Sequence, residues 1–165
     1  MRLLIIRHAI AVPRGTPGIP DDERPLTARG RRRFRRAARG LAWIVGRPDV
    51  LLTSPLIRAL ATAEIAAREW GRVKPAIEPA LARGNHARVL AALASQPPDA
   101  TIAVVGHEPY LSGLLSTLLG GAEADRLTFR KGGAALLELP GPPAEGGQLL
   151  WFLPPKLLRR LARRR

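Results

Sequence analysis

Residues 3–8 read Leu-Leu-Ile-Ile-Arg-His, and residues 103–109 read Ala-Val-Val-Gly-His-Glu-Pro. Each stretch is a short apolar run that ends in a histidine, and the whole chain contains only three histidines. An apolar run without alternation is typical of a strand covered on both faces, as in a parallel sheet. In open α/β sheets, ligands bind in the crevice beyond the carboxyl ends of the strands. The two stretches therefore place His8 and His107 where a ligand site is expected.

The length and composition predict one ordinary domain over residues 1–165. The chain is 46% hydrophobic, which is enough for a core without disulfides or metal staples. It has no cysteine, so disulfides, thiolate nucleophiles and cysteine-rich metal sites are excluded. The first apolar run, residues 3–6, is shorter than the core of a signal peptide or a membrane span. We expect a cytoplasmic protein without stable membrane insertion.

The net charge of +14 would attract phosphates, nucleic acid or an anionic membrane. Residues 29–39 contain seven arginines, and residues 156–165 contain six basic residues. Two interpretations stay open: a selected anion-binding surface, or solvated helix faces that reflect genome base composition. Aromatic residues make up only 4% of the chain, and no nucleic-acid-binding signature is present. Nucleic acid is therefore not the expected partner.

The chain alternates apolar runs with amphipathic stretches, which predicts strands that alternate with helices. Thr27 is the expected N-cap of a helix to Val45, and Ser54 followed by Pro55 predicts the start of a helix to Trp70. The expected strands are residues 3–7, 50–53, 76–78, 101–105, 134–139 and 148–153. The other expected helices are residues 87–94 and 109–119, with a basic helix or frayed tail at 155–165. This order predicts a doubly wound α/β fold.

Four side chains at the predicted strand ends suit phosphoryl transfer. A neutral imidazole can attack phosphorus, and arginine forks neutralise the phosphoryl oxygens. Arg7 and His8 follow one strand, Arg58 lies in the first turn of the helix after another, and His107 precedes a helix. A lone histidine after a strand is more often structural, so the hypothesis depends on the convergence of all four groups. The third histidine, His86, begins a helix in polar surroundings and is assigned no role.

Five motifs occur in the order in which the histidine phosphatase superfamily carries them, and together they span nearly the whole chain. They are residues 3–9, residues 21–30, residues 53–59 with Thr62-Ala63, residues 105–109 and residues 130–133. The chain thus resembles this superfamily, also called phosphoglycerate mutase-like. More narrowly, it resembles the small phosphohistidine phosphatases of the SixA type.

The resemblance implies a three-layer αβα sandwich with a mostly parallel central sheet. It implies that His8 is the nucleophile of a phosphohistidine intermediate. Arg7, Arg58 and His107 would form the phosphate pocket, and His107 would also stabilise the transferring group. No metal and no cofactor is expected.

The resemblance also points to the loop before the first helix. Arg24, in the segment Arg-Pro-Leu-Thr, is a further expected phosphate contact. Asp21 matches the position of a proposed proton donor in the SixA-type group, with Asp22 and Glu23 as close rivals. All three carboxylates could instead be loop residues that only interact with solvent.

Two departures from the family pattern bear on the substrate. Ala9 stands where the signature has glycine, so its methyl group could narrow the approach to His8. Mutases and broad phosphatases of this superfamily carry a glutamate after the third strand, but residues 81–84 read Leu-Ala-Arg-Gly here, and Glu78 precedes them in a strand position. An alkoxide leaving group needs a proton in the transition state, whereas the nitrogen of a phosphoramidate is easily protonated beforehand. The missing glutamate therefore favours phosphohistidine over sugar phosphates.

The sequence predicts a metal-independent phosphatase that acts through His8 on phosphohistidine in a partner protein. A short chain leaves little room for a lid, so an open site that accepts a phosphorylated side chain is expected. The alternatives are a small-molecule phosphomonoesterase of the same fold, and a polyanion-binding module with a degenerate site.

Overall fold

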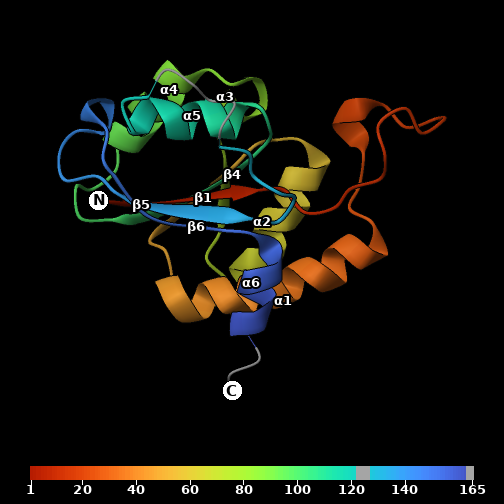
Figure 1. Cartoon of the computed structure of the whole chain (residues 1–165). Helices are drawn as coiled ribbons and strands as arrows, with labels where there is room; N and C mark the ends of the chain where they lie inside the picture. Colours follow the sequence, from red (N-terminus) through yellow and green to blue (C-terminus); the bar gives the residue numbers. More distant parts are fainter. Residues whose placement is uncertain (122–126, 163–165) are drawn as a thin grey trace.

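A six-stranded sheet forms the centre of the part of the chain that the computed structural model describes, residues 1–121 and 127–162 (Figure 1). Its strand order is β3-β2-β4-β1-β5-β6. The first four strands in this order pair in parallel, and β5 runs antiparallel to both β1 and β6. The strands are β1 (Arg2–Arg7), β2 (Val50–Thr53), β3 (Pro75–Ile77), β4 (Thr101–Gly106), β5 (Ala134–Glu138) and β6 (Gln148–Leu153).

Helices cover both faces of this sheet, and each face has its own apolar core. In β1, Leu4 and Ile6 pack toward α1, α2 and α6, while Leu3 and Ile5 pack toward α3, α4 and α5 (Figure 1). All four side chains are fully buried, as the unbroken apolar run predicts. The helices are α1 (Ala28–Val45), α2 (Ile57–Glu69), α3 (Ala80–Arg83), α4 (His86–Ala94), α5 (Tyr110–Leu118) and α6 (Pro155–Leu161). The three-layer fold with a mostly parallel sheet is thus confirmed.

The first helix begins and ends where the sequence predicts. The Thr27 side chain accepts the N–H of Gly30 at 2.9 Å, which satisfies one of the free donors of the first turn. The helix continues to Val45, and its buried side chains include Phe34, Ala38 and Leu41. The stripe of apolar residues every three or four positions therefore faces the core.

The predicted start of the second helix is wrong by two residues. The helix begins at Ile57 rather than at Pro55, with Leu56 as its N-cap. The Ser54 hydroxyl accepts the N–H of Leu56 at 3.3 Å and also contacts His107 at 2.8 Å. Because Ser54 is held by this tight turn and by a distant histidine, it does not cap the helix.

One short helix was not predicted. The Glu78 carboxylate, just after β3, accepts the N–H of Ala80 at 2.9 Å and closes the turn that starts α3. The helix lasts four residues and ends at Gly84, which adopts a left-handed conformation with φ of 68°. Too few residues are involved for a periodic pattern to reveal it.

The predicted basic helix or tail at 155–165 is a helix at Pro155–Leu161, and residues 163–165 lie outside the described residues. It packs against α1 so closely that a Cβ added to Gly40 would lie 2.1 Å from the carbonyl oxygen of Leu158. The Leu158 side chain is fully buried, whereas Leu157 is 40% exposed. Within residues 1–121 and 127–162, none of the helices is long and apolar enough to cross a membrane.

Substitution of Leu158 tests whether α6 is an integral part of the fold. We expect Leu158→Ala to lower the free energy of unfolding by about 2–5 kcal/mol, because it removes buried methyl groups and leaves a cavity. Leu157→Ala, one position earlier and partly exposed, should cost less than about 1 kcal/mol. Urea denaturation followed by circular dichroism measures both. Equal, small losses would show that α6 does not stabilise the domain.

Candidate active site

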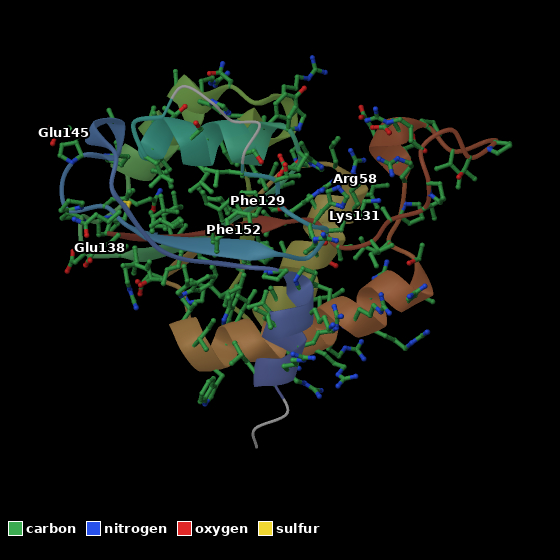
Figure 2. The ribbon with its side chains drawn as sticks, viewed as in Figure 1. Arg58, Phe129, Lys131, Glu138, Glu145 and Phe152 are labelled. Carbon is green, nitrogen blue, oxygen red and sulfur yellow. The ribbon has the colours of Figure 1, made fainter. Side chains whose placement is uncertain are left out.

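The sequence-predicted site residues lie at one end of the sheet, beyond the carboxyl ends of three adjacent strands. Arg7 and His8 leave β1, Arg58 lies in the first turn of α2 after β2, and His107 follows β4. A cavity of about 290 Å³ opens among these side chains. It is lined by Arg7, His8, Arg14, Arg24, Arg58, His107, Glu108 and Lys131. Figure 2 shows Arg58 and Lys131 at this end of the molecule, with Glu138 and Glu145 at the other.

The His8 ring is held in one tautomer. Its Nδ1 lies 2.7 Å from the carbonyl oxygen of Ala9, and a carbonyl only accepts, so Nδ1 carries the hydrogen. The pKa of His8 is lowered to about 3, chiefly by burial and also by the nearby His107, Arg58 and Arg7, while the hydrogen bond to Ala9 acts in the opposite direction. At neutral pH the ring is therefore uncharged, with the lone pair of Nε2 free to attack.

His107 lies beside His8, with 5.1 Å between the two ring centroids. Its Nε2 is 2.8 Å from the Ser54 hydroxyl. Burial, followed by the charges of Arg58 and Arg7, lowers the pKa of His107 to about 3, so this ring is also neutral. A hydroxyl that donates to Nε2 leaves the ring hydrogen on Nδ1, where it can be donated to a ligand.

Three buried nitrogen atoms of the site have no hydrogen-bond partner in the part of the chain that the structure describes. They are Nε of Arg7, Nε of Arg58 and Nδ1 of His107, and the remaining such atom is Nε1 of Trp70. Buried polar atoms are almost always paired, because an unpaired donor costs about 1–3 kcal/mol. Three of them around one cavity fit an anion that offers several acceptor oxygens.

Thr62 connects the segment after β1 to the first turn of α2, which carries Arg58. Its hydroxyl donates to the carbonyl oxygen of Arg58 at 2.6 Å and accepts the N–H of Ala9 at 3.0 Å. One side chain thus fixes the first turn of α2 relative to the segment after β1. Sequence reasoning included Thr62 in a motif but gave it no role.

Asp21 binds three arginines at the edge of the cavity, from a single helical turn at Asp21–Glu23. Its carboxylate lies 2.9 Å from Arg14, 2.9 Å from Arg24 and 3.4 Å from Arg58. Its main-chain carbonyl also accepts from Nη1 of Arg58 at 2.6 Å. The hydrogen bond from Arg14, together with Arg24 and Arg58, lowers the pKa of Asp21, so the carboxyl is ionised at neutral pH. These contacts suit a residue that positions arginines better than one that donates a proton.

The other residues of this loop differ in burial. Arg24 is buried, donates from Nη1 to the carbonyl oxygen of Val12 at 2.7 Å, and lines the cavity. Asp22 and Glu23 are exposed. The position of Arg24 is consistent with the expected phosphate contact, which stays a prediction.

Two departures from the family pattern can now be located. The Ala9 methyl group lies in the apolar core and not among the residues that line the cavity of about 290 Å³, so it does not narrow this cavity. Glu78 starts α3, and Leu81 is buried in the core on that face. Neither Glu78 nor Leu81 lines the cavity. Among the described residues that do line it, Glu108 alone carries a carboxylate. Among all the residues that the structure describes, no three His, Cys, Asp or Glu side chains cluster to hold a metal ion.

Sequence reasoning missed Glu108, which supports the position of Arg7. Its carboxylate accepts the N–H of Phe129 and the hydroxyl of Ser112, both at 2.6 Å. The carbonyl oxygen of the same Phe129 accepts from Nη1 of Arg7. Phe129 therefore links the carboxylate to the guanidinium. The feature of the sequence that could have pointed to Glu108 is its position directly after His107.

Lys131 was missed as well. It lines the cavity, and its pKa is lowered by partial burial and by repulsion from Arg7, Arg24 and Arg58. The glycines that follow it are the sequence signal, because Gly132 adopts a φ of 77° and its N–H reaches the carbonyl oxygens of Arg7 and His8. The loop is thus fixed directly over the end of β1.

Comparison with known proteins agrees with this geometry. Residues 3–85 match the histidine phosphatase superfamily (branch 1), and the chain belongs to this family. An uncharacterised protein of Picosynechococcus sp. is 35% identical over 136 residues, which cover 81% of this chain and 82% of the relative. The structure of the protein histidine phosphatase SixA complexed with tungstate is 25% identical, with a TM-score of 0.83 over 96% of this chain and 99% of that one. A candidate phosphohistidine phosphatase SixA from Nakamurella multipartitia is 27% identical, with a TM-score of 0.75 over 92% and 94%.

The buried neutral histidines predict a pH-dependent stability. The pKa of His8 and His107 is about 3 in the folded protein and near 6.5 in the unfolded chain, so the unfolded chain binds more protons between these values. Stability is therefore full above pH 6.5 and falls as the pH drops toward 3. We expect a loss of about 2–4 kcal/mol in the free energy of unfolding between pH 7 and pH 5.

Urea denaturation at the two pH values measures this loss. His86→Asn, at a histidine outside the cavity, should keep it in full, whereas the double variant His8→Asn/His107→Asn should lose most of it. A wild type that is equally stable at both pH values would contradict the prediction.

The substitution Asp21→Asn tests whether Asp21 positions the arginines or donates a proton. We expect kcat/KM to fall about tenfold, because Arg24 and Arg58 lose an ion-pair partner that orients them. The fall should be the same for aryl phosphates with good and with poor leaving groups. A proton donor would instead be needed most for the poor leaving group, where its loss costs about 10²–10⁴-fold. Asp22→Asn, at the exposed neighbour, serves as the control and should leave both rates unchanged.

Proposed function

We propose that this chain is a phosphatase that transfers a phosphoryl group to His8, and that its substrate is a phosphohistidine on a partner protein. The observation that carries the proposal is the composition of one cavity. A neutral imidazole with a free Nε2 shares that cavity with residues whose buried donors are otherwise unpaired. A nucleophile next to unpaired donors is what an attack on a phosphoryl group requires.

In the first step, the Nε2 lone pair of His8 attacks phosphorus, and the bond between phosphorus and the leaving imidazole nitrogen breaks. Arg7, Arg58 and His107 donate to the phosphoryl oxygens as charge builds up on them. The His8 ring becomes cationic, and the carbonyl of Ala9 stabilises this form through Nδ1–H. The leaving nitrogen takes its proton from solvent.

In the second step, water attacks the phosphorus of the enzyme intermediate. The bond between phosphorus and Nε2 of His8 breaks, inorganic phosphate leaves with the new oxygen, and the surplus proton passes to solvent. His8 returns to the neutral tautomer that bonds Ala9.

The carboxylates near the cavity support a phosphoramidate substrate. Asp21 is ionised by its arginine partners, and Glu108 accepts hydrogen bonds from Phe129 and Ser112. Neither arrangement supplies a proton to an alkoxide, a deficit of about 10²–10⁴-fold for an ester. A phosphohistidine avoids this deficit, because its nitrogen can be protonated from solvent before the bond breaks.

The entrance of the cavity and the similarity to SixA favour a protein substrate. Lys131 is exposed, and the Arg14 side chain is 79% exposed, so cationic groups reach from the cavity to solvent. The tungstate-bound structure with a TM-score of 0.83 is named a protein histidine phosphatase. A phosphorylated side chain on a protein surface fits such an open, cationic entrance.

Hydrolysis of a phosphohistidine-bearing protein and of an aryl phosphate, with chelator present, tests the proposal. We expect wild-type turnover of the phosphoprotein to survive the chelator, and His8→Ala to lower it by about 10³-fold or more because the nucleophile is lost. His86→Ala is the matched control and should keep wild-type rates.

Other results would revise the proposal in defined ways. Faster turnover of phosphate esters than of phosphohistidine would keep the mechanism and make the protein a small-molecule phosphatase. Failure of both substrates to depend on His8 would favour a polyanion-binding module.

A further inference from the structure

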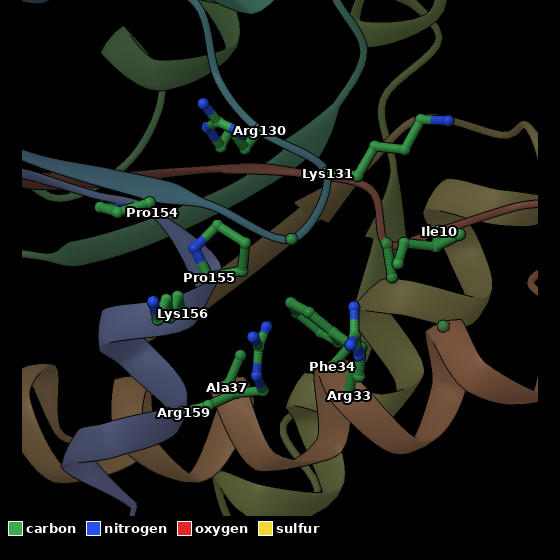
Figure 3. Close-up of a pocket in the computed structure, with 13 residues that line it drawn as sticks. Ile10, Arg33, Phe34, Ala37, Arg130, Lys131, Pro154, Pro155, Lys156 and Arg159 are labelled. Atoms are coloured by element: carbon green, nitrogen blue, oxygen red, sulfur yellow. The ribbon is translucent and has the colours of Figure 1, made fainter.

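A second cavity, of about 350 Å³, lies between α1, α6 and the loop at residues 130–133 (Figure 3). We call it the α1–α6 cavity. Figure 3 shows Arg33 on α1 and Arg159 on α6 with Phe34 between them, and Lys131 on the loop with its side chain directed away from both. Its basic lining residues are Arg33, Arg130, Lys131, Lys156 and Arg159.

The cationic groups of this cavity are uncompensated. None of its lining residues is acidic, and none of the five basic ones forms an ion pair within residues 1–121 and 127–162. Partial burial and repulsion from Arg33 and Arg36 lower the pKa of Arg159. A bound anion would relieve this repulsion, so the cavity has the electrostatics of an anion site.

The α1–α6 cavity adjoins the catalytic cavity. Lys131 lines both, and Ala9, the residue after His8, lines the α1–α6 cavity. The N–H of Gly132 is bonded to the carbonyl oxygens of Arg7 and His8, each at 3.1 Å, so the main chain of the loop that carries Lys131 is held beside the proposed nucleophile. A ligand that occupies both cavities would present a phosphoryl group and a second negative charge.

The basic surface also extends away from the catalytic cavity. Arg36 and Arg160 join Lys156 and Arg159 around a further hollow of about 270 Å³ on the same two helices. A small dianion would fill only the α1–α6 cavity, which is the part of this basic surface next to the catalytic cavity. An extended acidic segment would reach the basic residues of both hollows.

We infer that the α1–α6 cavity binds an acidic segment of the phosphoprotein substrate, close to its phosphohistidine. This inference rests on the proposed function and defines its substrate class: phosphohistidine proteins with clustered Asp or Glu residues beside the phosphorylated side chain.

Two phosphohistidine peptides of equal length test the inference, one flanked by glutamates and the other by glutamines. We expect wild-type KM to be about tenfold lower for the acidic peptide, as two or three added charge pairs predict, with similar kcat. In Arg33→Gln/Arg159→Gln the two KM values should become nearly equal. Arg31→Gln/Arg35→Gln is the matched control, because it removes the same charge from exposed positions on α1 that line neither cavity. It should keep the preference.

Binding of a fluorescent, unphosphorylated glutamate peptide gives a measurement that does not depend on activity. Anisotropy should show binding to the wild type and to the Arg31/Arg35 control, and about tenfold weaker binding to the Arg33/Arg159 variant. If neither phosphopeptide is hydrolysed, the proposed function fails while this binding still decides the inference.

Three results would overturn the inference. They are equal KM values for both peptides in the wild type, equal losses in the two double variants, and tighter binding of a short DNA strand than of the glutamate peptide at the same cavity. Circular dichroism of each variant confirms that the fold is retained.

Discussion

The parallel pairing of β1 with β4 is the constraint on which the site depends. Arg7 lies opposite Gly106 in this register, so the histidines that follow leave the sheet side by side. The N–H of His8 is bonded to the carbonyl oxygen of Gly106 at 3.0 Å, and the two rings lie 5.1 Å apart. A slip of one residue would reverse which side chains of β1 face each core. The fully buried apolar run that holds the sheet together therefore also fixes the distance between the two histidines.

Burial of cations beside imidazoles explains both the reactivity and the stability cost of the site. The same enclosure and the same arginines that would hold phosphate keep His8 and His107 unprotonated. Arg58 is almost fully buried, and its charge is balanced in part by Asp21. The site is thus prepared for an anion before one binds, and unpaired donors are part of the cost of this preparation.

The sequence predicts the features of this protein that depend on contacts between residues close together in the chain. Thr27 caps α1 through a contact three residues away, and the strands that carry His8 and His107 follow from continuous apolar runs. The sequence could not predict that Ser54 lies in a turn and does not cap α2, because its side chain contacts His107, which is 53 residues away in the chain. The support that Glu108 gives to Arg7 passes through the peptide of Phe129, and this link exists only once the chain has folded. The four central site residues were predictable because Arg7 ends a strand, His8 and His107 directly follow one, and Arg58 lies in the first turn of the helix after another, whereas their supporting contacts are tertiary.

Lys131 belongs to both cavities, and this shared position has a thermodynamic consequence. An anion in either cavity changes the electrostatic field at the other, so the two occupancies are coupled. Coupling of this kind is reciprocal: the factor by which one ligand changes the affinity of the second equals the factor by which the second changes the first. Inorganic phosphate left at His8 after turnover would then compete with retention of the substrate's charged segment. Release of inorganic phosphate and release of the dephosphorylated partner protein would therefore be thermodynamically linked.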